Sequence, residues 1–175
     1  MSRFLSICTW FLVMPAISWS QGIQFNQKIE DQRPGDSILI GYCTRDSLQG
    51  STFGIQFKQA YNSYQPDQEV INDVLRSPEK LRGVMITIVM ATWCSDSRIQ
   101  VPRFFKLLDN IQLYSRCTII CTNRQKLAGY ISLDGMEIVK VPTFIFFRKG
   151  KEIGRIIETP KISLDQDFYD IISKK

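Results

Sequence analysis

The sequence predicts an α/β fold with a mixed central sheet flanked by helices. Short apolar runs rich in β-branched or aromatic residues, such as 84–90 and 143–147, have the length of buried strands. Segments whose apolar residues recur at helical spacing stand between such runs, and this alternation is typical of α/β domains. The chain has 175 residues, of which 44% are hydrophobic, enough for one domain with a sizeable core.

Residues 1–20 have the pattern of a secretory signal peptide. Arg3 precedes an apolar run over residues 4–17, and small residues follow at the positions that signal peptidase reads. We therefore expect cleavage before Gln21, export to the periplasm or out of the cell, and no stable membrane insertion after cleavage. A retained membrane anchor is the alternative, although the run is shorter than the about 20 apolar residues of a spanning helix.

Residues 21–80 are predicted to form an N-terminal β/α extension in the same domain as a core over residues 81–175. Within the extension, residues 38–42 have the pattern of a short strand. Apolar and aromatic residues at helical spacing predict a helix over residues 53–64. A second helix is expected to begin at Asp67 and to end before Pro78.

In the core, the predicted elements again alternate between strands and helices. They are, in order, a strand over 84–90, a helix after Cys94, a strand over 116–122, a strand opening at Pro142, a hairpin turn over 148–151 and a return strand over 152–158. Ser163 and Gln166 have the spacing of a capping box, so a final helix is expected there. Residues 123–130 are predicted to form a brief helix and a loop.

The most informative local feature is the motif Trp93-Cys94-Ser95-Asp96-Ser97, which follows the strand over residues 84–90. Its cysteine is expected at the N-terminus of the next helix, where unpaired N–H groups and the positive end of the helix dipole favour thiolate over thiol. Cys94 is therefore the candidate nucleophile. The Ser97 hydroxyl and the Arg98 cation are expected to stabilise its thiolate, while Asp96 opposes them.

Together with Lys140-Val141-Pro142-Thr143, this motif resembles the thioredoxin superfamily over about residues 82–175. In that superfamily, Trp-Cys-x-x-Cys opens the first long helix, and a Val-Pro-Thr segment holds a cis proline that faces the active sulfur. Pro102 falls where the superfamily has a kinking proline. The residues of the motif are most similar to those found in secreted bacterial thioredoxin-like proteins.

The resemblance implies a thioredoxin-like fold and a groove for an extended substrate, shaped by Trp93, Val141 and Pro142. It also shows two departures from the superfamily pattern. Ser97 replaces the second, resolving cysteine, and Ile88 stands where reductive thioredoxins carry a buried acid. Cys94 alone can form a mixed disulfide, but another thiol must release it.

These departures predict thiol–disulfide exchange through a single nucleophilic cysteine, of an isomerase or mixed-disulfide type rather than net reduction. The expected partners are protein thiols or disulfides, and small thiols are a further option. The alternative is a non-catalytic thioredoxin-like module that binds an envelope protein, with Cys94 as a relic. A peroxidase is a weaker interpretation, because Thr92 lies two residues before Cys94 rather than in a Pro-x-x-x-Thr-x-x-Cys pattern.

The composition excludes several other classes of function. The chain has no histidine, which removes imidazole bases and the commonest zinc sites, so we expect no metal and no cofactor. The basic residues are scattered among acidic ones, which argues against a nucleic-acid-binding stripe.

The remaining cysteines are expected to be structural. Cys117 and Cys121 lie on one predicted strand about 13 Å apart, which is beyond the reach of a disulfide. Both are interpreted as small core residues. Cys43 lies in the extension, and a role as a remote resolving partner for Cys94 stays open.

Overall fold

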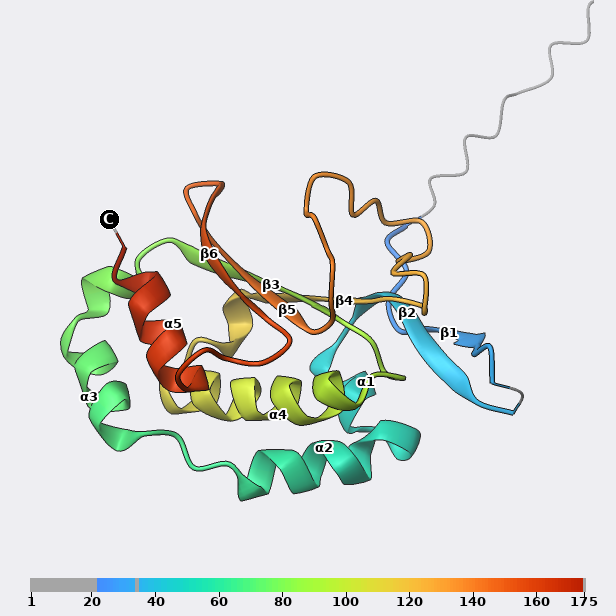
Figure 1. The fold of residues 1–175 in the computed structure, drawn as a ribbon, viewed down its shortest axis with the longest axis horizontal. Coiled ribbons are helices and arrows are strands. Elements are labelled where there is room, and N and C mark those ends of the chain that lie inside the picture. Colours follow the sequence, from blue (N-terminus) through green and yellow to red (C-terminus); the bar gives the residue numbers. More distant parts are fainter. Residues whose placement is uncertain (1–21, 34, 175) are drawn as a thin grey trace, which may run out of the picture.

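The computed structural model describes residues 22–33 and 35–174 and confirms the predicted α/β class (Figure 1). Six strands form one mixed sheet in the order β1-β2-β4-β3-β5-β6. The parallel pair is β3–β4, and the other four pairs are antiparallel. The strands are β1 (Gln27–Glu30), β2 (Ser37–Cys43), β3 (Val84–Met90), β4 (Cys117–Cys121), β5 (Thr143–Arg148) and β6 (Lys151–Ile157).

The helices predicted in the extension, after Cys94 and near the C-terminus are all present. Asp67 and Ser163 cap two of them, each side chain accepting hydrogen bonds from N–H groups of the first turn. The α-helices are α1 (Arg45–Gln49), α2 (Ser51–Ser63), α3 (Gln68–Arg76), α4 (Ser95–Asn110) and α5 (Leu164–Ile172), with short 3-10 helices η1 (Pro78–Leu81) and η2 (Tyr114–Arg116). The α4 helix continues through Pro102.

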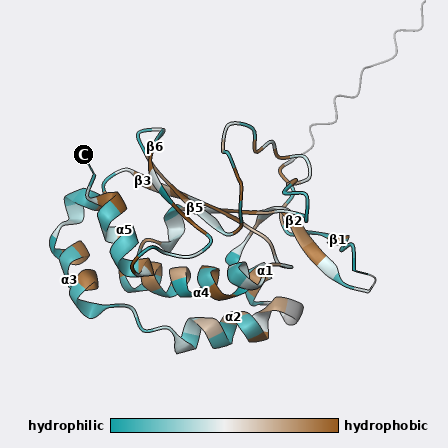
Figure 2. Ribbon diagram, viewed as in Figure 1, coloured by the Kyte–Doolittle hydropathy of each residue, from teal (hydrophilic) through white to brown (hydrophobic). Residues whose placement is uncertain are grey.

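The main hydrophobic core lies between the sheet and the helices. Along β3, alternate residues from Val84 to Met90 point into this core, and every α-helix of the described chain contributes side chains to it. Its centre is aromatic, because the Phe104 ring on α4 lies 4.5 Å from the Phe144 ring on β5, centroid to centroid, and also packs against Phe168 on α5. The strands accordingly carry most of the hydrophobic colouring in Figure 2.

The opposite face of the sheet is covered by an irregular segment, residues 123–141, which we call the covering loop (orange in Figure 1). Its residues Leu133, Met136 and Ile138 pack against a second, smaller apolar cluster that includes Val89. The end of β3 and the residues that follow it, including Cys94, are therefore held between a helical layer on one side and the covering loop on the other.

The prediction of a brief helix within residues 123–130 is wrong. The Asn123 side chain accepts hydrogen bonds from the N–H groups of Gln125 and Leu127, and Lys126 and Gly129 both have positive φ. Such side-chain to backbone bonds offer the chain an alternative to the helical ladder. Residues 123–130 form tight turns instead.

The predicted extension supplies two strands of the same sheet and is tied to α4. β2 pairs directly with β4, which makes it an inner strand rather than an appendage. The Arg45 guanidinium donates two hydrogen bonds, of 2.7 and 2.6 Å, to the Asp109 carboxylate on α4. Within residues 22–33 and 35–174, we find no helix of the length and apolarity that crossing a membrane requires, and the predicted signal peptide lies outside these residues.

Candidate active site

Cys94 lies between the end of β3 and the start of α4. β3 ends at Met90, and Cys94 is the N-cap residue of α4, with an extended backbone and no side-chain cap hydrogen bond. The Cys94 N–H donates to the Ala91 carbonyl at 3.1 Å, which closes the turn between the two elements. The side chain is partly exposed. A sulfur atom with solvent access therefore stands beside the unpaired N–H groups of the first turn of α4.

The Cys94 sulfur faces the segment that opens β5. Its thiol donates a hydrogen bond to the Val141 carbonyl, with Sγ and oxygen 3.2 Å apart. The Val141–Pro142 peptide bond is cis, as predicted. The structure thus brings Trp93, Cys94, Val141 and Pro142 together at one end of the sheet.

Ser97 occupies the predicted position but makes a different contact. Its side chain is fully buried, and its hydroxyl oxygen accepts a hydrogen bond from the Ala91 N–H at 3.2 Å. The expected hydrogen bond from Ser97 to the Cys94 sulfur is absent from the contacts of the described residues. In this structure Ser97 therefore holds the turn after β3 rather than the sulfur.

Arg98, the cation predicted to stabilise the thiolate, makes its hydrogen bonds to other groups. Its Nε donates to the Thr92 carbonyl at 2.5 Å, and one terminal nitrogen donates to the Gln56 side chain on α2 at 3.2 Å. The Thr92 hydroxyl oxygen in turn accepts the Leu39 N–H at 3.1 Å, linking the active-site turn to β2. Arg98 thus joins the active-site turn to the extension.

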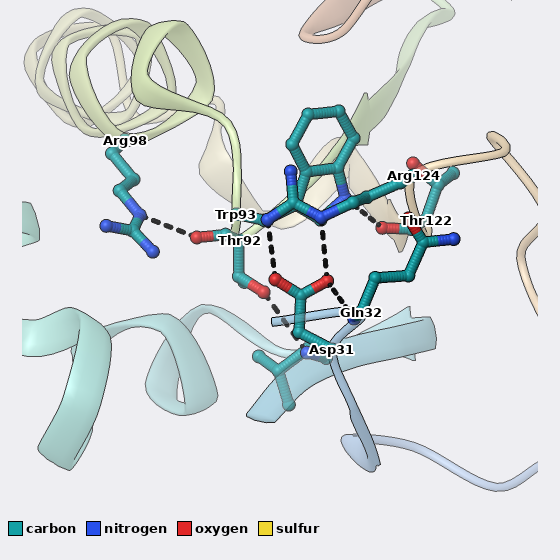
Figure 3. A network of polar contacts seen from close by, with 8 residues as sticks. Asp31, Gln32, Thr92, Trp93, Arg98, Thr122 and Arg124 are labelled. Carbon is teal, nitrogen blue, oxygen red and sulfur yellow. Dashed lines mark hydrogen bonds and ion pairs between the residues drawn. The ribbon is translucent and has the colours of Figure 1, made fainter. Parts of the chain in front are cut away.

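Trp93 is fixed by a network that the sequence did not reveal (Figure 3). The Trp93 indole N–H donates to the Thr122 carbonyl at 3.1 Å, and the Arg124 guanidinium lies 4.9 Å from the centre of the ring system. Arg124 also donates two hydrogen bonds, of 2.9 and 2.5 Å, to the Asp31 carboxylate. The Asp31 side chain is only 3% exposed.

This pairing determines the charge of the Asp31 carboxyl. The hydrogen bond from Arg124 holds the pKa of Asp31 below its usual value, with smaller help from the Gln32 N–H. The carboxylate form therefore keeps Arg124 against the Trp93 ring. No local motif predicts this network, because Asp31 and Arg124 are separated by 93 residues in the sequence.

The other described cysteines are placed away from Cys94. Cys43 and Cys121 belong to the main core beneath the helices, whereas Cys94 packs against the smaller cluster on the opposite face of the sheet. Cys43 is therefore not positioned to resolve a disulfide at Cys94. The Cys43 thiol and burial raise the pKa of Cys121 well above its usual value, and burial raises the pKa of Cys117 to about 12. The cysteines in the described ranges are all free.

The described part of the chain contains no cluster of three or more cysteine, aspartate or glutamate side chains that would hold a metal ion. The reactive group at the site is the Cys94 sulfur, with the Val141 carbonyl and the first turn of α4 beside it.

Comparisons with known proteins identify thioredoxin-like relatives at low identity. No protein-family model matches the chain. It is 27% identical to thioredoxin-like protein R548 of Acanthamoeba polyphaga mimivirus over 53% of this chain and 65% of the viral protein. It is 25% identical to thioredoxin H9 of Arabidopsis thaliana over 60% of this chain and 71% of the plant protein. The first match therefore spans slightly less than two thirds of the relative's length.

Among solved structures, a protein of unknown function from Pseudomonas aeruginosa covers 67% of this chain and 74% of its own length, with a TM-score of 0.44 and 16% identity. The curated relatives and the six-stranded mixed sheet flanked by helices together show that the fold is thioredoxin-like. The curated relatives support a relationship of this chain to the thioredoxin superfamily.

Proposed function

We propose that this protein carries out thiol–disulfide exchange through Cys94 as its single nucleophile. The observation that carries the proposal is the partly exposed Cys94 sulfur at the start of α4, facing the cis Val141–Pro142 segment. The names of the relatives, which are thioredoxins or thioredoxin-like proteins, support thiol–disulfide chemistry at the level of the superfamily. Protein thiols and disulfides are the corresponding substrates.

The reaction needs no external electron acceptor or donor. The Cys94 thiolate attacks one sulfur of a substrate disulfide, a mixed disulfide forms, and the second substrate sulfur leaves as a thiolate. A thiol of the same substrate, or a small thiol, then attacks the mixed disulfide and releases Cys94. Because Ser97 supplies no second sulfur, exchange and isomerisation are favoured over net reduction.

Attack requires the sulfur to leave its hydrogen bond with the Val141 carbonyl, because that bond is made only by the protonated thiol. The first-turn N–H groups of α4 are then the donors available to the thiolate, since no side chain caps them. Trp93 and the cis Val141–Pro142 segment are proposed to bind the substrate chain beside the sulfur, as an added strand.

A non-catalytic module that binds a protein partner is the second candidate. It is favoured by the same hydrogen bond, which a thiolate could not donate, and by the Ser97 hydroxyl, which contacts the Ala91 N–H rather than the sulfur. In that case, the surface around Trp93 would bind a partner without covalent chemistry.

Cys94 should react with a thiol reagent at least about tenfold faster than Cys43, Cys117 or Cys121 in the folded protein. The reason is that its sulfur is partly exposed at a helix N-terminus, whereas Cys43 and Cys121 are buried and Cys117 has a raised pKa. Limited labelling followed by peptide mass mapping measures this order. Cys94→Ala should also remove the adduct that forms with glutathione disulfide. Equal labelling of all four thiols, or an undiminished adduct in the variant, would contradict the proposal.

Export is proposed on the N-terminal pattern described above. The protein isolated from its native cell should begin at or within a few residues of Gln21, because small residues precede that position after the apolar run. Mass spectrometry of the intact protein measures the new N-terminus. A product that retains Met1 would contradict cleavage, and one that retains Met1 in the cytoplasm would also contradict the proposed envelope location.

A further inference from the structure

A basic groove runs along α2 and α4 beside the candidate site. It has a volume of about 680 Å³, and residues of both helices line it together with Trp93 and Arg33. Gln56, Gln59, Ala60 and Ser63 follow one face of α2, while Ser95, Arg98, Ile99 and Arg103 line it from α4. The two helices lie side by side in Figure 1. Along α4 the lining residues run from Ser95, next to Cys94, to Arg103, so the groove extends away from the N-terminus of this helix.

The charges in this groove are of one sign. Its lining includes three arginines, Arg33, Arg98 and Arg103, and no acidic residue. None of the three forms an ion pair within the described ranges, where the other arginines on α1, α3 and β6 do. Asp31, the acid whose pKa Arg33 lowers, is already held by Arg124.

Arg103 is not fully satisfied by its neighbours. Its guanidinium lies 5.8 Å from the centre of the Tyr64 ring, and its Nε is buried without a hydrogen-bond partner in the described chain. Arg98 donates only to neutral groups, the Thr92 carbonyl and the Gln56 amide oxygen. Guanidinium groups without an acidic partner are the side chains best suited to bind carboxylates, because two N–H groups match two oxygens.

We propose that this groove binds an acidic peptide segment that flanks the reacting cysteine of a disulfide substrate. This inference rests on the proposed exchange at Cys94 and specifies its substrate class. The residues on each side of Cys94, Trp93 and Ser95, line the groove, whereas Cys94 itself does not. A peptide joined to the sulfur would therefore reach the groove with the residues that flank its own reacting cysteine. From Ser95 to Arg103 the helix rises about 12 Å, which matches three or four extended residues.

The test uses three peptides that carry one cysteine activated as a 2-pyridyl disulfide, followed by three glutamates, three glutamines or three lysines. At low salt, Cys94 should react with the glutamate peptide on the order of tenfold faster than with the glutamine peptide, and slowest with the lysine peptide. The ratio of the glutamate-peptide rate to the glutamine-peptide rate should fall as salt screens the arginines. Arg103→Gln should lower this ratio severalfold, while Arg76→Gln, which removes an equal charge on α3, should leave the ratio unchanged.

Equal rates for the glutamate and glutamine peptides would overturn the inference, and so would an equal effect of Arg103→Gln and Arg76→Gln. A separate measurement distinguishes failure of the groove from failure of the exchange reaction. Non-reactive peptides with serine in place of cysteine should bind the full chain in the order glutamate, glutamine, lysine. If no activated peptide reacts at Cys94 but this order of binding is observed, the proposed exchange reaction is contradicted and the proposed peptide binding is supported. If the peptides react without charge preference, only the proposed peptide binding is contradicted.

Discussion

A Ser97→Cys variant is expected to gain net disulfide reductase activity that the natural chain has only weakly. Residue 97 lies one helical turn after Cys94 and is fully buried at the start of α4, so the new sulfur would lie within reach of Cys94. An intramolecular attack would then replace a step that otherwise needs a second molecule. Reduction of insulin by the variant, driven by an external dithiol, should rise on the order of tenfold.

Two control variants separate this effect from a general change at the helix start. Ser95→Cys adds a sulfur to an exposed neighbouring position without the spacing of a resolving cysteine, and Ser97→Ala removes the hydroxyl that holds the Ala91 N–H. Neither should gain reductase activity. Activity should stay below that of a dithiol thioredoxin, because buried Ile88 cannot move protons. Absence of a 94–97 disulfide on oxidation would show that the local geometry is not that of a thioredoxin site.

Phe104→Ala is expected to produce the largest loss of stability of any single truncation on α4. The Phe104 ring has no exposed surface and packs against Phe144, Phe146 and Phe168, so its removal leaves a cavity that three rings border. Truncation of a buried phenylalanine costs about 3–5 kcal/mol. That is a large share of the about 5–15 kcal/mol by which domains are usually stable. Urea unfolding followed by circular dichroism measures the difference.

Ile99→Ala is the matched control on the same helix. The Ile99 side chain lies on the solvent side and is 41% exposed, so its truncation should change stability by less than about 0.5 kcal/mol. If Phe104→Ala does not fold, Phe104→Leu should fold and still lose more stability than the control. A loss below about 1 kcal/mol for Phe104→Ala would mean that the aromatic centre of the core is packed differently.

Elements with a strong periodic pattern could be predicted from the sequence. The strand predicted over residues 84–90 has the same bounds as β3. The capping residues Asp67 and Ser163 marked the starts of α3 and α5. These features depend on neighbours within a few residues, so a single sequence contains them. The segment over residues 123–130 was misread because its turns are set by the Asn123 side chain and by positive φ at Lys126 and Gly129.

The candidate site could be predicted only in part, for a similar reason. The motif around Cys94 located the sulfur, and the resemblance located the cis bond at Pro142. The direction of the Ser97 hydroxyl and the Arg98 side chain could not be read, because each depends on which backbone carbonyl or N–H lies opposite after packing. The contact between Asp31 and Arg124 and the basic groove along α2 and α4 arise only from tertiary structure.

The contacts around Cys94 also bear on the order in which the chain acquires its function. Leu39 and Thr92 are 53 residues apart, Cys94 and Val141 are 47 apart, and Asp31 and Arg124 are 93 apart. Contacts of such sequence separation form late, because long loops must close before they contribute. The environment of Cys94 is therefore completed only when β1, β2 and the segment that opens β5 have all joined the sheet. During refolding, the labelling rate of this one sulfur should report on completion of the whole domain rather than on formation of α4.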